Sequence, residues 1–86
     1  MDWKRYLDSV NKKSNIPGKP IVEIAGQNRV LIENHQGVLA YSLEEVQIKV
    51  SYGKLVIQGR NLRLLHLSKE QLVVNGHIDS VNLFGR

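Results

Sequence analysis

The chain has 86 residues, a formal net charge of +4 and no cysteine. A chain of this length forms one domain, and the lack of cysteine excludes disulfide bonds and thiolate metal sites. The sequence contains no run of about 20 apolar residues that could cross a bilayer, and its first residues lack the apolar run of a secretory signal. We therefore expect a soluble protein, or one that binds a membrane only peripherally.

The positive charge is concentrated at the N-terminus. Residues 1–20 carry five basic and two acidic side chains, whereas the other 66 residues carry seven basic and six acidic ones. Binding of nucleic acid needs a dense basic face that displaces counterions from phosphates. Because the body of the protein is nearly neutral, we expect no nucleic-acid partner.

Apolar side chains near the N-terminus recur with the spacing of one helix face, at i, i+3, i+4 and i+7. We predict a short amphipathic helix there, followed by a linker in which Pro17-Gly18 and Pro20 end the helical pattern. A stripe flanked by basic residues is typical of helices that bind an anionic membrane surface or a partner, and it would equally suit packing on the body. The candidate docking residues are Trp3, Lys4, Arg5, Tyr6, Leu7, Val10, Lys12 and Lys13.

Residues 1–20 are thus predicted to form the helix and linker, and residues 21–86 the β-domain. From Ile21 onward, short runs of Val, Ile and Leu alternate with polar residues and are separated by turn residues. The most specific turn signal is Asn75-Gly76, which suits a two-residue type I′ hairpin. We predict eight strands, over residues 21–25, 29–34, 37–42, 45–51, 54–58, 62–66, 71–75 and 77–84.

Gly26, Gly59 and Gly76 each follow an apolar-x-apolar-x pattern. Such a repeat is compatible with a stacked β-solenoid and also with a set of similar hairpins. Short turns between consecutive strands favour antiparallel neighbours, and eight short strands need a second layer to bury their apolar faces. The prediction is an all-β fold, a small antiparallel β-sandwich or partly closed barrel, with the β-solenoid as the alternative.

The stretch Glu33-Asn34-His35-x-Gly37 raises the question of catalysis. In a strand, Glu33 and His35 would share a face and could form an ion pair. A catalytic histidine, however, needs a nucleophile or a second acid oriented by a third group. Because Asn34 and Gly37 suit the left-handed backbone of a tight turn, we interpret the stretch as a turn.

A metal site would require His35, His66 and His77 to converge from three strands. No pair of them has the spacing of helical or hairpin ligands, and His66 and His77 both stand next to predicted turns. The adjacent carboxylates Glu44-Glu45 would point to opposite faces of a strand. We therefore predict no catalytic residue, no metal and no cofactor, and a protein that is not an enzyme.

Several motifs of the β-domain occur together: Glu33-Asn34-His35-x-Gly37, then Val46-x-Ile48-x-Val50, then Gly53-x-Leu55-x-Ile57-x-Gly59-x-Asn61-Leu62, and the closing "VVNGHIDSVNLF", which contains Gly76. In this combination the chain resembles the YabP/YqfC family of sporulation proteins, and more closely its YqfC branch. The resemblance covers nearly the whole β-domain. The basic N-terminal segment is less characteristic of the family, so its interpretation rests on this sequence alone.

The resemblance implies a role in forming the endospore, in assembly of the spore cortex or coat. Family members are made in the mother cell, and many are encoded beside an integral-membrane sporulation protein. The resemblance supplies no catalytic residues, so its motif residues Asn34, His35, Gly37, Gly53, Gly59 and Gly76 are expected to be turn residues.

We accordingly expect an adaptor in the mother-cell cytoplasm, peripheral to the membrane around the forespore and bound to a membrane sporulation protein. The last predicted strand is the candidate edge for the contact, through Val81, Leu83 and Phe84. Exposed strand edges are natural templates for partner strands. The alternative is self-association of the repeated hairpins into a morphogenetic scaffold of the spore envelope.

Overall fold

The computed structural model describes residues 19–51 and 53–85, so the predicted N-terminal helix lies outside the described residues. Within these two ranges no helix is long and apolar enough to cross a membrane. The described residues form six strands: β1 (Ile21–Ala25), β2 (Arg29–Glu33), β3 (Val38–Tyr41), β4 (Glu45–Val50), β5 (Gly53–His66) and β6 (Gln71–Gly85).

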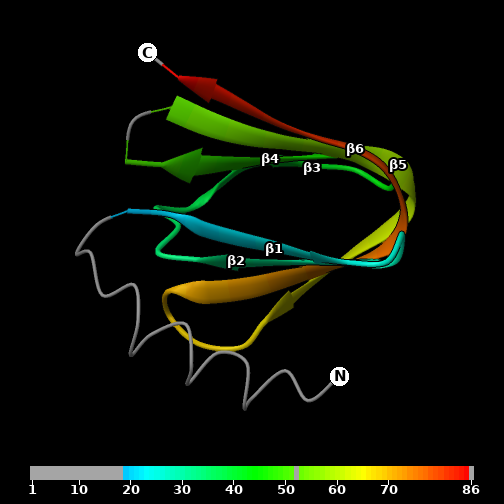
Figure 1. Cartoon of the computed structure of the whole chain (residues 1–86), viewed down its shortest axis with the longest axis horizontal. Coiled ribbons are helices and arrows are strands. Elements are labelled where there is room, and N and C mark those ends of the chain that lie inside the picture. The colour runs from blue at the N-terminus through cyan, green and yellow to red at the C-terminus, as the bar shows by residue number, and fades with distance from the viewer. Residues whose placement is uncertain (1–18, 52, 86) are drawn as a thin grey trace.

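The strands form one antiparallel sheet in the order β1-β2-β6-β5-β4-β3. The two long strands, β5 and β6, bend halfway along their length, and the sheet folds over into two layers (Figure 1). Layer A contains β1, β2, the start of β6 and the end of β5. Layer B contains β3, β4, the start of β5 and the end of β6. The predicted all-β, antiparallel architecture is confirmed, and the described strands do not form the parallel coils of a solenoid.

The predicted count of eight strands is wrong. Residues 54–58 and 62–66 belong to the single strand β5, and residues 71–75 and 77–84 belong to β6. The predicted hairpin at Asn75-Gly76 is likewise wrong, since β6 continues through it. Glycine and asparagine supply positive φ in a bulged bend as readily as in a turn, and Asn61 has φ 53° and Gly76 φ 139°.

The two bends lie against one another. Arg60 of β5 pairs with His77 of β6, and the register shifts on either side of this pair, where each strand accommodates an extra residue. A Cβ atom on Gly59 would lie 1.9 Å from the carbonyl oxygen of His77. The bend therefore depends on close contact between the two backbones, which a side chain at this position would prevent.

The inner faces of the two layers meet in a core of aliphatic side chains. β2, β4, β5 and β6 contribute alternate residues, the bend itself contributes Leu62 and Ile78, and Val22 of β1 and Val38 of β3 pack against the cluster while only partly buried. Burying such a side chain stabilises the fold by about 1.5–3 kcal/mol, so this core is the main source of stability. Its members are Val30, Ile32, Val46, Ile48, Leu55, Ile57, Leu62, Leu72, Val74 and Ile78.

Gly59→Ala is expected to destabilise the protein by about 3 kcal/mol or more, because the methyl group would overlap a backbone carbonyl that cannot move without opening the bend. This is a large part of the stability of so small a domain. Urea unfolding followed by circular dichroism measures the effect.

Gly26→Ala is the matched control. Gly26, unlike Gly59, has a positive φ, of 59°, and a Cβ atom there would meet no atom within 4 Å. We expect a loss of only about 1 kcal/mol from backbone strain. Equal losses in the two variants would contradict the assigned role of the bend.

Candidate functional site

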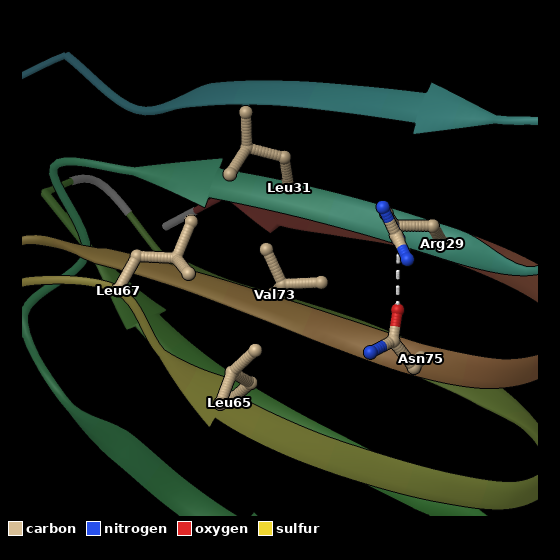
Figure 2. A pocket seen from close by; sticks show the side chains of 6 residues that line it. All are labelled: Arg29, Leu31, Leu65, Leu67, Val73 and Asn75. Atoms are coloured by element: carbon tan, nitrogen blue, oxygen red, sulfur yellow. Dashed lines mark hydrogen bonds between the residues drawn. The ribbon is translucent and has the colours of Figure 1, made fainter. Parts of the chain in front are cut away.

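Apolar side chains from three strands line a groove on the outer face of layer A, the face turned away from the core (Figure 2). Leu31 of β2 lies opposite Val73 of β6, and Val73 lies opposite Leu65 of β5. Leu67, which follows β5, lines the same hollow of about 150 Å³. The floor of the groove is thus a row of aliphatic side chains running across the strands.

Two polar pairs bound this row along the strand direction. At one end, Arg29 Nε donates a 3.0 Å hydrogen bond to Asn75 Oδ1. At the other, Gln71 Nε2 donates a 2.6 Å hydrogen bond to Glu33 Oε1. Both pairs bridge β2 and β6, two residues before and two residues after the Leu31–Val73 pair. The arrangement suits the binding of apolar side chains.

The groove is deep on one side and open on the other. Leu31 is only 1% exposed and Val73 6%, whereas Leu65 is 52% exposed and Leu67 47%. The strand-by-strand prediction missed this groove, although the sequence contains a signal for it. In Val30-Leu31-Ile32 and Leu72-Val73-Val74 the apolar residues are consecutive, which is typical of strands that bury both faces.

The Asn34–Gly37 stretch crosses from layer A to layer B and is hydrogen-bonded to both. Asn34, at φ 61°, donates from its backbone N–H to Glu70 O at 2.9 Å and from its side chain to Lys19 O at 2.8 Å. On the side of layer B, the N–H of Gln36 donates to Lys49 O at 2.7 Å, and the N–H of Lys49 donates to Gly37 O at 2.8 Å. The stretch therefore joins the two layers at the end opposite the bend.

His35 lies within this junction. Its Nδ1 accepts a 3.1 Å hydrogen bond from the Gly37 N–H, whereas its buried Nε2 has no hydrogen-bond partner among the described residues. The ring of His66 lies nearby, with 6.2 Å between the ring centroids. Burial lowers the pKa of His35 below its ordinary value of 6.5, and the charge of His66 acts in the same direction.

The third histidine is elsewhere, at the bend, where His77 Nε2 lies 2.9 Å from Asp79 Oδ1. Over residues 19–51 and 53–85, no group of three or more His, Cys, Asp or Glu side chains is placed to hold a metal ion. The structure thus brings two of the three histidines together and leaves the third apart.

Glu45 accepts hydrogen bonds from the side-chain amides of Gln47 and Gln58, which lower its pKa.

The end of β6 forms an open edge of the sheet. The start of β6 pairs with β2 as far as Asn75, and Gly76 and Ile78 then donate backbone hydrogen bonds to the β1–β2 turn. Residues 80–85 pair only with β5 among the described strands. We call residues 80–85 the β6 edge.

The three predicted edge residues differ in their surroundings. Val81 packs against the core. Leu83 and Phe84 are 51% and 52% exposed. The predicted docking residues of the N-terminal helix, from Trp3 to Lys13, lie outside the described residues.

His35→Asn is expected to weaken the dependence of folding stability on pH. In the unfolded chain His35 takes up a proton near pH 6.5, whereas in the folded protein it does so only at lower pH. The stability that neutral His35 contributes is therefore complete above pH 6.5 and is lost as the pH falls through the folded pKa. Asn retains an acceptor for the Gly37 N–H but does not titrate.

Urea unfolding at a pH near 7.5 and a pH near 5 measures this difference. His66→Asn is the control, because it removes only the weaker electrostatic cause and should keep most of the pH dependence. An unchanged pH dependence in His35→Asn would show that another group is responsible.

Comparison with known proteins places the chain in a family. The family model described as the YabP family matches residues 18–85. The chain is also 32% identical over 62 residues to the uncharacterized protein YqfC of Bacillus subtilis (strain 168), an alignment that covers 72% of this chain and 67% of that protein. No solved structure matches. The family match takes in the bend, the layer junction and the β6 edge, and the chain belongs to the YabP family.

Proposed function

We propose that the protein is a non-enzymatic sporulation protein that acts as an adaptor in forming the endospore envelope. Membership of the YabP family supports the connection with sporulation. The proposed partner is an integral-membrane sporulation protein, bound from the mother-cell cytoplasm at the membrane around the forespore. The adaptor would contribute to assembly of the cortex or coat.

The observation that carries the adaptor role is the β6 edge. Natural proteins protect open edges with charged residues, prolines or bulges. From Ser80 to Gly85 the edge has no charge and no proline, and its register with β5 is regular. Such an edge can pair with a strand of a partner through main-chain hydrogen bonds, while flanking side chains provide specificity. Leu83 and Phe84 are half exposed on this edge, so their side chains are available for such specific contacts.

The adaptor role predicts that Leu83→Lys/Phe84→Lys lowers recovery of a membrane sporulation protein about tenfold or more, as a loss of about 1.4 kcal/mol in binding would do. Both side chains are half exposed, so the double variant should remain folded. The measurement is affinity purification of the tagged chain from sporulating cells, together with a count of heat-resistant spores.

Leu39→Lys/Leu43→Lys is the matched control, since these leucines are equally exposed but lie on β3 and the turn after it. The control should keep both the partner and the spore yield. Undiminished recovery by the folded Leu83→Lys/Phe84→Lys variant would exclude the β6 edge as the contact.

A second candidate function is self-assembly into a scaffold. Among the described strands, β3 forms a further open edge as the last strand of the sheet, and Leu39, Tyr41 and Leu43 are exposed there. Two different edges on one chain can pair head to tail and generate open assemblies.

If the protein is a scaffold, light scattering of the purified chain should show a mass that rises with concentration into the high micromolar range. The adaptor role predicts a constant monomer mass under the same conditions. A monomer at every concentration would count against unassisted self-assembly.

A further inference from the structure

The groove on the outer face of layer A has a surface suited to binding apolar side chains. Leu31 and Val73 are almost completely buried although they lie on the outer face of the sheet. Leu65 and Leu67, on the open side, are half exposed. A sheet face that is apolar on its outer side requires cover from a further element or a partner.

The size of the groove matches a helix. Leu31 and Leu65 are separated by β6, so they lie two strand spacings apart, or about 10 Å. A helix with its side chains is about 10–12 Å in diameter. One helix laid over β6 would therefore contact Leu31 on one side and Leu65 and Leu67 on the other.

The chain itself contains a segment that is predicted from the sequence to form a helix of the required character. Trp3, Tyr6, Leu7 and Val10 have the spacing of one helix face. A helix of about eight residues is marginal in water unless its apolar face is packed on something. The predicted stripe and the groove are thus complementary in chemistry and in width.

The described chain begins beside the groove. The Asn34 side-chain amide donates a 2.8 Å hydrogen bond to Lys19 O, and the Asn34 backbone N–H donates a 2.9 Å hydrogen bond to Glu70 O. Lys19 therefore lies at the end of layer A where Leu67 and the β5–β6 turn also lie. Leu31 is only two residues along β2 from Glu33, or about 7 Å. The linker of residues 11–18 can extend over about 26 Å, so its length allows the stripe to reach the groove.

We propose that the N-terminal stripe of Trp3, Tyr6, Leu7 and Val10 packs as a helix into the groove formed by Leu31, Leu65, Leu67 and Val73 of the same chain. Two acidic residues lie near the groove and could attract the basic side chains of this segment. Glu23 lies opposite Leu31 on the outer face, and Glu70 accepts a hydrogen bond from Asn34, close to Lys19. The helix would cover layer A and leave the β6 edge in layer B open, so this proposal does not depend on the adaptor role.

Trp3 is the one tryptophan of the chain, so its fluorescence reports the position of the stripe. In the 86-residue chain without lipid, we expect emission at the short wavelengths of a buried indole. Leu65→Asp/Leu67→Asp should shift the emission to the long wavelengths of a water-exposed indole. Leu39→Asp/Leu43→Asp, with equally exposed leucines outside the groove, should leave the emission unchanged. Circular dichroism confirms that each variant retains its strands.

Three results would overturn the proposal. In the first, the wild-type emission is already that of exposed indole, or is the same in the groove variant. In the second, a short-wavelength emission arises only when vesicles of phosphatidylglycerol and phosphatidylcholine are added, which would assign the stripe to the membrane. In the third, the emission depends on protein concentration, which would assign it to a second copy of the chain.

An independent measurement uses the absence of cysteine from the chain. Leu7→Cys/Leu65→Cys should form an intramolecular disulfide on mild oxidation, whereas Leu7→Cys/Leu39→Cys should not. Failure of the first pair, equal reaction of both pairs, or disulfide-linked dimers alone would contradict docking within one chain.

Discussion

The contact between the backbones of β5 and β6 at their bends is the constraint on which the rest of the fold depends. Gly59 leaves no room for a Cβ atom against His77 O, and Gly76 faces the backbone of Asn61. A bulge releases backbone groups from their strand partners, and these groups need new ones. The two short turns provide them. Gly59 and Leu62 donate to the β3–β4 turn, and Gly76 and Ile78 donate to the β1–β2 turn. The β3–β4 hairpin therefore stabilises the bend of β5, and the β1–β2 hairpin stabilises the bend of β6.

The bend determines which surfaces are closed and which are open. By folding one sheet over on itself, it places the inner residues of β2 and β4 in a common core, without a second sheet. It also gives β6 two environments. The first part lies between β2 and β5, whereas residues 80–85 pair with β5 alone among the described strands. The edge on which the proposed adaptor role rests is thus a direct consequence of the bend.

At the opposite end, the Asn34–Gly37 junction limits how far the two layers can separate. It bonds to the turn after β5 on one side and to β4 on the other. His35 has its Nδ1 engaged by the Gly37 N–H and its Nε2 buried, and its pKa is lowered by that burial. These features describe an imidazole that is held neutral as part of the structure. Bend and junction together fix the outer face of layer A, where the apolar groove lies.

Local patterns in the sequence were sufficient for the all-β class, for four of the strands to within one or two residues, and for the family. They also pointed to Gly59, Asn61 and Gly76 as places where the chain changes direction. They could not distinguish a turn from a bend, because both use the same small residues and both accept a positive φ, as Asn61 and Gly76 have here. That choice was made by tertiary structure. Two long strands side by side resume their pairing on both sides of a shared bend, and Arg60 still pairs with His77 within it, whereas four short strands would end there. The open edge and the groove follow from that pairing between residues distant in the chain, so they became visible only in the folded molecule.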